Sequence, residues 1–188
     1  MDVWLISLES DAGTVLSPDE EERAARFRFE QDRARWIRAH SALRRILAHA
    51  SGISAEAIRF TLGPHGKPAL ANVEGVEFSL SHAGSWAMVA VTKGVPVGID
   101  IERIRENVNM AALLRRLGET ELPDSPADLF RMWNRREART KALGGPLLEL
   151  PRADFRLCDL EAPNGYSAAL ALVGCDPVVR QHSTSVLR

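Results

Sequence analysis

The sequence predicts an α+β fold in which two similar α+β lobes pack around a cleft. Each half of the chain carries helical patterns followed by strand patterns, and no low-complexity linker separates the halves. The chain has 188 residues, 45% of them hydrophobic, and chains of this size bury roughly 70% of their unfolded surface. We therefore predict an N-terminal lobe over residues 1–94, a C-terminal lobe over residues 95–188, and an active site in the cleft between them.

Signals for the start or the end of a helix occur in both predicted lobes. Ser17-Pro18-Asp19-Glu20 combines a capping serine, a proline at the first helical position and a glutamate three residues after the cap. The helix that follows carries five arginines, and helical spacing of apolar residues continues to about Ala50, before Gly52. In the second half we expect helices at 110–117 and 128–143, the latter ended by Gly144-Gly145-Pro146.

Strand and turn signals fill the rest of the chain. β-branched and apolar runs between turn residues predict strands at 3–8, 58–62, 76–81, 86–92, 96–103, 154–158 and 166–173. A hairpin turn is expected at 82–85, and a turn with one cation at its tip at 63–68. The C-terminal tail beyond 178–179 gives no clear pattern.

Composition limits the classes of partner. The net charge of −1 argues against a nucleic-acid surface. No apolar run reaches membrane-spanning length, and the N-terminus lacks a secretory leader pattern. Cys158 and Cys175, without a CxxC motif, are expected to be buried thiols in a reducing compartment. We predict a cytoplasmic protein, monomeric because its two lobes already form the cleft, without nucleic-acid or membrane partners.

Asp100 and Glu102 lie at i and i+2 in a predicted strand and therefore share one face. Two carboxylates on one face repel each other unless a cation lies between them, and oxygen ligands suit Mg²⁺ or Mn²⁺. For this pair considered alone, an exposed acidic strand edge is the simpler interpretation.

Glu137 and Lys141 lie at i and i+4 on the long helix and share a face. An exposed ion pair worth about 0.2–0.5 kcal/mol is one interpretation. The other rests on the scarcity of lysine: only Lys67, Lys93 and Lys141 occur among 24 basic residues, and lysine can donate a proton where arginine cannot. Three carboxylates, a metal and a lysine are a recurrent set for phosphoryl transfer.

Four segments, in this order, resemble the signatures of the 4′-phosphopantetheinyl transferases of the single-chain, Sfp-type branch. They are GKP at 66–68, FSLSHAGSW at 78–86, VGIDIE at 97–102 and WNRREARTKALG at 133–144. The resemblance extends weakly to Arg26-Phe27 with Asp32-Arg33 and to residues 165–170. It implies a fold of two α+β lobes related by a pseudo-twofold, with coenzyme A in the cleft.

The resemblance also implies a reaction and a role for each matching residue. Phosphopantetheine would pass from coenzyme A to a serine of an apo acyl or peptidyl carrier protein, releasing 3′,5′-ADP. Asp100, Glu102 and Glu137 would bind Mg²⁺. Glu137 would also activate the serine, and Lys141 would protonate the leaving group. Coenzyme A would be bound by Arg23, Arg26, Lys67, Ser81, His82 and Lys141.

Three positions depart from the family pattern, and two other functions stay open. Arg136 stands where lysine is common, Glu20 stands where a basic residue is often found, and Gly144-Gly145-Pro146 replaces a G-x-G type stretch. Arg23, with Arg26, must then bind the 3′-phosphate. The alternatives are a non-catalytic module that binds coenzyme A or a carrier, and a metal-dependent phosphohydrolase. Fatty-acid, polyketide and nonribosomal-peptide carriers are all candidate partners.

Overall fold

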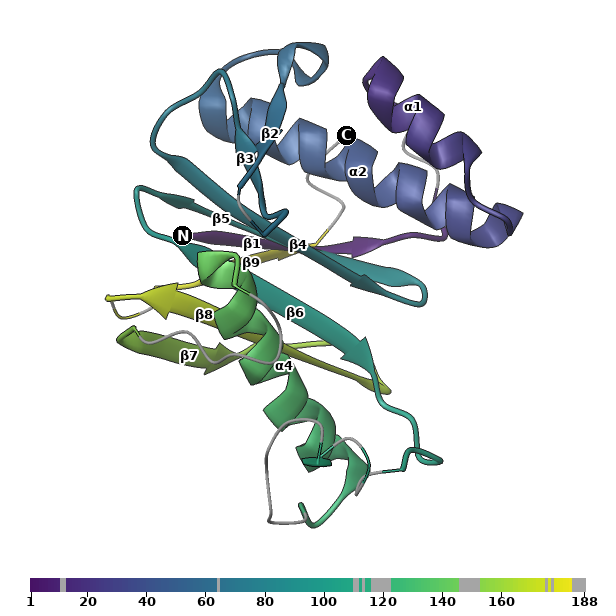
Figure 1. Ribbon diagram of the computed structural model, residues 1–188, viewed down its shortest axis with the longest axis vertical. Helices are drawn as coiled ribbons and strands as arrows, with labels where there is room; N and C mark the ends of the chain where they lie inside the picture. The colour runs from purple at the N-terminus through teal and green to yellow at the C-terminus, as the bar shows by residue number, and fades with distance from the viewer. Residues whose placement is uncertain are drawn as a thin grey trace.

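A computed structural model describes residues 1–10, 13–63, 65–109, 112, 114–115, 123–145, 153–174, 176 and 178–183. Its elements lie in layers, in the order helices α1 and α2, a first sheet, a second sheet and helix α4 (Figure 1). This arrangement confirms the predicted α+β class. Among the described residues, no helix is long and apolar enough to cross a membrane.

The strands are β1 (Asp2–Ser7), β2 (Phe60–Leu62), β3 (Pro68–Leu70), β4 (Val76–Ala83), β5 (Trp86–Lys93), β6 (Val97–Arg103), β7 (Phe155–Asp159), β8 (Tyr166–Val173) and β9 (Arg180–Ser183). The helices are α1 (Pro18–Ala25), α2 (Glu30–Ser51) and α4 (Pro126–Leu143), with a short 3₁₀ helix, η1 (Ala55–Ala57). Strand order is β4-β5-β1-β9 in the first sheet and β6-β8-β7 in the second, and β2 and β3 form a separate ribbon.

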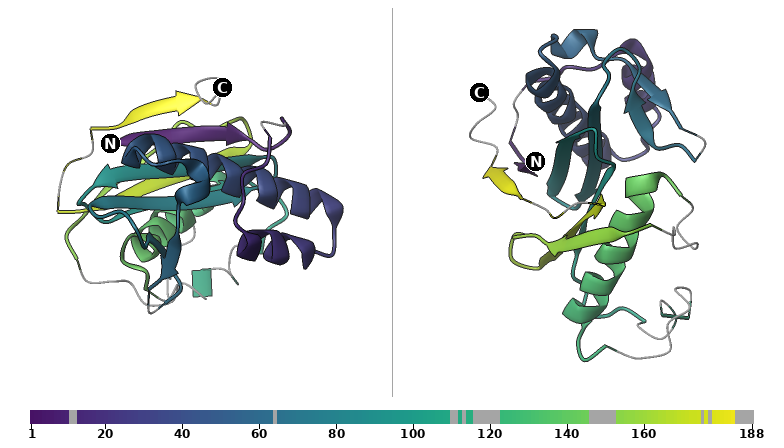
Figure 2. Two further views of the ribbon diagram at one scale, coloured as in Figure 1. Left: turned by 90° about the horizontal axis from the view of Figure 1, so that it is seen from above. Right: turned by 90° about the vertical axis from the view of Figure 1, so that its left-hand side faces the viewer.

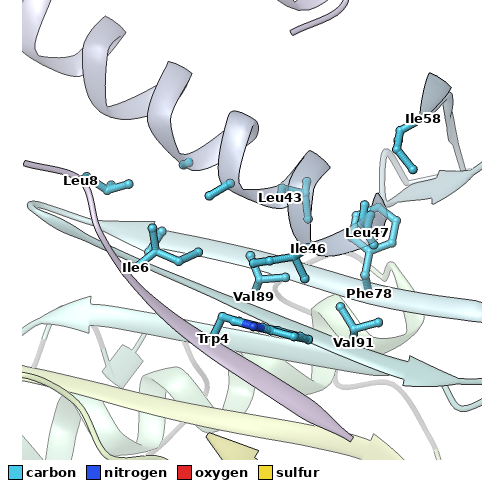
Figure 3. Close-up of a cluster of buried hydrophobic side chains, with 13 residues drawn as sticks. Trp4, Ile6, Leu8, Leu43, Ile46, Leu47, Ile58, Phe78, Val89 and Val91 are labelled. Carbon is cyan, nitrogen blue, oxygen red and sulfur yellow. The ribbon is translucent and has the colours of Figure 1, made fainter. Parts of the chain in front are cut away.

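The first sheet carries α2 on its outer face. Leu43, Ile46 and Leu47 of α2 point at the sheet, where Trp4 and Val89 meet them (Figure 3). This apolar stripe at helical spacing fixes α2 against β1, β4 and β5. The parallel pairing of β9 with β1, visible in Figure 2, adds a strand from the end of the chain to this sheet.

The second sheet divides its side chains cleanly between two layers. Ile99 and Ile101 of β6 pack with Met88 and Ala90 of the first sheet. Because side chains alternate along a strand, Gly98, Asp100 and Glu102 face the other way, toward α4. The division places the acidic pair on the face of the second sheet that α4 covers.

Several predicted elements need correction. The arginine-rich helix predicted after Ser17 is broken at residues 26–29, so Arg28 lies in a connection between α1 and α2. His82 belongs to β4, and only Gly84-Ser85 form the hairpin turn. Strands β3 and β9 were not predicted. The helix expected at 110–117 falls mostly outside the described residues, although Ala112, Leu114 and Arg115 are helical.

The thiol prediction was wrong for Cys158, which is partly exposed because β7 is the edge strand of its sheet. Cys175 and Pro146 lie outside the described residues.

The division into lobes at residue 94 and their pseudo-twofold relation stay predictions. One core cluster joins β1 and β5 to β6 and β8, so side chains from both halves share it.

Candidate active site

Gly98 brings α4 onto β6. A Cβ atom at Gly98 would lie 1.9 Å from the Ala138 carbonyl oxygen and 2.5 Å from the Ala142 amide nitrogen. Real Cβ atoms do not approach backbone this closely, so the helix rests directly on the strand at this residue. The close contact sets Glu137 and Lys141 of α4 beside Asp100 and Glu102 of β6.

We expect Gly98→Ala to destabilise the protein by at least about 1–3 kcal/mol, because the added methyl group must push strand and helix apart. Urea denaturation measures the loss. Gly145→Ala is the matched control, since a Cβ there meets nothing within 4 Å. Equal stability of the two variants would contradict the close packing of α4 on β6.

Asp100, Lys141 and Ser81 form a hydrogen-bonded cluster. The Lys141 ammonium donates to Asp100 Oδ1 over 2.6 Å and to Ser81 Oγ over 3.0 Å. The Ser81 hydroxyl also donates to Asp100 Oδ1, over 2.8 Å. The Asp100 side chain is 3% exposed and that of Lys141 is 31% exposed, so the ion pair joins a buried anion to a partly accessible cation.

The three predicted carboxylates influence one another electrostatically. Burial raises the pKa of Asp100, and the Lys141 ammonium opposes that shift only in part. Burial also raises the pKa of Glu102, with the charge of Asp100 adding to it. The pKa of Glu137 is raised by burial and by the charges of Asp100 and Glu102. The structure therefore brings all three together as a cluster that favours an added positive charge.

The cluster has the donors that a hard divalent cation requires. Among the described residues, no three His, Cys, Asp or Glu side chains are arranged to hold a metal ion together. Asp100 Oδ2 is nonetheless buried without a hydrogen-bond partner. Glu102 and Glu137 are half-buried. Carboxylate oxygens are the ligands that Mg²⁺ takes, so the donor type of these residues fits the ion.

His82 connects this cluster to α2. The residue is exposed overall, yet its ring lies close enough to protein atoms that desolvation lowers its pKa. The charges of His40 and Lys141 lower it further, and Asp32 opposes them. Because His40 and Asp32 belong to α2, the cluster and the N-terminal half of α2 share one region.

Lys67 lies at the opposite end of the contact between β6 and α4. Its ammonium donates to the Ala142 carbonyl oxygen over 2.6 Å and to that of Val97 over 3.3 Å. Burial lowers the pKa of Lys67, and Glu77 opposes the shift. The lysine thus caps the C-terminus of α4, and its predicted contact with coenzyme A stays a prediction.

Arg23 and Arg26 share an open hollow beside α1. The hollow has a volume of about 730 Å³ and is lined by Asp19, Glu22, Arg23, Arg26, Phe27 and Arg28. The Arg23 guanidinium lies 5.6 Å from the centre of the Trp36 ring, which stacks on His40 at 3.8 Å. His40, at the end of this stack, is one of the charges that lower the pKa of His82. A second hollow of about 830 Å³ borders β1 and β9, and its lining does not include Asp100, Glu102 or Glu137.

Glu20, which departs from the family pattern, has a structural role. It receives hydrogen bonds from Arg44 Nε at 2.6 Å and from the Ser17 amide at 2.9 Å, and lies 3.3 Å from His40 Nδ1. Burial alone would raise the pKa of Glu20, but these hydrogen bonds from His40, Ser17 and Arg44 lower it to about 2. The carboxylate therefore fastens α1 to α2 and fixes the helix that carries Arg23.

Glu20→Gln is expected to destabilise the protein by about 3 kcal/mol at neutral pH. A carboxylate with a lowered pKa in the folded state contributes stability above its ordinary value of 4.5 and loses it as pH falls toward about 2. In urea denaturation, the gap between wild type and Glu20→Gln should therefore narrow as pH falls below about 4.5 and close only near pH 2. Glu22→Gln, in an exposed ion pair with Arg26, should cost less than about 1 kcal/mol. A pH-independent gap would contradict the role of the Glu20 charge.

Comparison with known proteins places the chain in a family. Residues 8–94 match the model of the N-terminal part of 4′-phosphopantetheinyl transferases. The chain is 32% identical over 177 residues to 4′-phosphopantetheinyl transferase HetI of Nostoc sp. strain PCC 7120, covering 85% of this chain and 75% of the relative. It is 34% identical over 164 residues to 4′-phosphopantetheinyl transferase psf-1 of Bacillus pumilus, covering 76% and 70%.

A third relative is 4′-phosphopantetheinyl transferase Sfp of Bacillus subtilis strain 168, with 26% identity over 168 residues, 82% of this chain and 74% of the relative. These matches run through the strand and the helix that carry the carboxylate cluster, and they confirm the resemblance seen in the four sequence segments. With buried Asp100, a lysine and a serine assembled where those segments meet, the chain belongs to the family of 4′-phosphopantetheinyl transferases.

Proposed function

We propose that this protein transfers the 4′-phosphopantetheine group of coenzyme A to a serine of an apo carrier protein, in a Mg²⁺-dependent reaction that releases 3′,5′-ADP. The named relatives are 4′-phosphopantetheinyl transferases. The observation that carries the proposal is the meeting of Asp100, Glu102, Glu137 and Lys141 between β6 and α4. A purely structural ion pair would not need two further carboxylates with raised pKa values beside it.

Asp100, through its unpaired Oδ2, would hold Mg²⁺ together with Glu102 and Glu137. When bound there, the ion neutralises charge on the pyrophosphate oxygens. Burial has already removed much of the water from these carboxylates. The residues therefore meet the substrate in a medium where charge interactions are stronger than in bulk water.

Glu137 and Lys141 move the two protons of the reaction. The serine hydroxyl attacks the phosphorus that bears the pantetheine arm, and Glu137 takes the hydroxyl proton. The bond from that phosphorus to the bridging oxygen breaks, and Lys141 gives a proton to the departing 3′,5′-ADP. Ser81, bonded to both Lys141 and Asp100, fixes the position of the ammonium.

The nucleotide end of coenzyme A would lie along α1 and α2. Arg23 and Arg26 line the hollow beside α1, and guanidinium groups suit a phosphate monoester such as the 3′-phosphate. The charges of His40 and Lys141 both influence His82, and an imidazole can donate to a phosphate oxygen. Lys67, held by two carbonyl groups, would contribute mainly by fixing the end of α4.

The proposal is tested by incubating the protein with coenzyme A, Mg²⁺ and a panel of apo carriers from fatty-acid, polyketide and nonribosomal-peptide systems. Intact mass should show that one phosphopantetheine group is added to at least one carrier, and a carrier with its acceptor serine replaced by alanine is the control. Binding of coenzyme A without any added mass would favour a non-catalytic module. Cleavage of coenzyme A without a carrier would favour a phosphohydrolase.

A further inference from the structure

Helix α4 holds a buried amide without a hydrogen-bond partner. Asn134 is fully buried, and neither its Nδ2 nor its Oδ1 atom is paired with any described residue. Leaving such a group unpaired destabilises the fold, and each unpaired polar group buried in a native protein calls for an explanation. Leucine would fill a similar volume without burying an unpaired polar group, so the amide at this position needs an explanation.

The position of Asn134 along α4 is set by the contact at Gly98. Helix α4 and strand β6 run in opposite directions (Figure 1), and Gly98 lies against Ala138 and Ala142. Four residues toward the start of the helix advance about 6 Å, and two residues toward the end of the strand advance about 6.6 Å. Asn134 therefore lies opposite the part of β6 that carries Asp100 and Glu102.

The sheet beneath Asn134 is lined by small residues. Ala169 of β8 pairs with Asp100, and Ser167 pairs with Glu102, so both face α4. Among the described elements, helix α4 packs most extensively against β6, β8 and β7, which is consistent with its buried residues, Asn134 among them, facing this sheet. The strand positions facing α4 in this part of the sheet are therefore occupied by short side chains and the acidic pair.

Two unpaired and complementary groups share this interface. Asp100 Oδ2 is a buried acceptor without a donor, and Asn134 supplies both a buried donor and a buried acceptor. The Lys141 ammonium already donates a hydrogen bond to Asp100 Oδ1. The remaining carboxylate oxygen and the amide are therefore available for one further shared partner between β6 and α4.

We propose that Asn134 is a positioning residue of the carboxylate site, an inference that rests on the proposed function. Because neither the Asn134 amide nor Asp100 Oδ2 has a partner in the structure, the amide would act by hydrogen-bonding a water molecule of a hydrated Mg²⁺ held by the carboxylates. Magnesium usually keeps several water molecules when carboxylates bind it. Such a water molecule could donate a hydrogen bond to Asn134 Oδ1, an uncharged acceptor. Replacement of a group that orients metal ligands typically lowers metal affinity or activity by roughly 10- to 100-fold.

The test compares Asn134→Leu with Thr140→Val, measured with and without Mg²⁺. Thr140 is also buried on α4, but its hydroxyl already donates to the Arg136 carbonyl oxygen. We expect metal-free Asn134→Leu to melt at or above the wild-type temperature, because the unpaired amide is gone. It should lose most of the Mg²⁺-dependent rise in melting temperature and need about 10-fold more Mg²⁺ for half-maximal transfer. Thr140→Val should keep the wild-type response to Mg²⁺.

A wild-type response to Mg²⁺ in Asn134→Leu would overturn the proposal and leave Asn134 as a packing residue. If the leucine variant fails to fold, Asn134→Ala is measured in the same way, with the same two outcomes. The melting experiment needs no carrier. Loss of the Mg²⁺ response in a protein that modifies no carrier would therefore refute the proposed function and keep the inference about Asn134.

Discussion

Replacement of Glu137 by glutamine should reduce carrier modification by about 10²- to 10⁴-fold, the usual contribution of a general base. Glutamine keeps the size of the side chain but cannot accept the serine proton or contribute a charge to the cation site. Glu74→Gln, at an exposed carboxylate, is the matched control and should keep the wild-type rate. Intact mass of the carrier, followed over time, measures both variants.

The same Glu137→Gln variant should be at least as stable as the wild type in the absence of Mg²⁺. The raised pKa of Glu137 means that the folded state disfavours its charge, and this penalty is present above the folded pKa and disappears as pH falls through it. A neutral amide removes the penalty at all pH values. Wild-type transfer by Glu137→Gln, or a large loss of metal-free stability, would contradict the role given to this residue.

Replacement of Lys141 by methionine should both abolish transfer and destabilise the protein. The ammonium is the cation bound to buried Asp100, and breaking a buried ion pair by removing one partner costs about 3–5 kcal/mol. Because the Lys141 side chain is about a third exposed, the lower end, about 3 kcal/mol, is expected at neutral pH. Lys93→Met, at an exposed lysine, is the control and should be nearly neutral.

The effect of Lys141→Met should depend on pH in a defined direction. Burial already raises the pKa of Asp100, and loss of the ammonium raises it further. A buried carboxylate with a raised pKa destabilises the fold above that pKa, and the penalty is relieved as pH falls through it. The Lys141→Met/Asp100→Asn double variant should therefore regain stability at neutral pH in urea denaturation, without regaining transfer. A double variant no more stable than Lys141→Met would show that the two residues are not coupled.

Local patterns were sufficient for the elements that carry the site. The alternation in β6 predicted that Asp100 and Glu102 share a face, and the i, i+4 spacing predicted the same for Glu137 and Lys141. The structure adds what these patterns lack. Gly98, an ordinary strand glycine in the sequence, is the residue on which α4 rests, and that contact joins residues about forty positions apart.

The missed features share a physical cause. The break between α1 and α2 contains no glycine or proline, and Phe29 begins α2 without a side-chain cap, so no local signal marks it. Strand β9 is stabilised by pairing with β1 at the other end of the chain, which no local pattern reveals. The capping role of Glu20 was predicted from its neighbours, but its bond to Arg44 joins another helix.

The central claim is that the carboxylates and the lysine between β6 and α4 carry out phosphopantetheinyl transfer. The most direct measurement is the intact mass of a modifiable apo carrier after incubation with coenzyme A, Mg²⁺ and either wild type or Asp100→Asn. We predict that wild type adds one phosphopantetheine group, that chelation of Mg²⁺ prevents the addition, and that Asp100→Asn leaves the carrier unmodified. Full modification by Asp100→Asn, or by wild type without a divalent cation, would contradict the account.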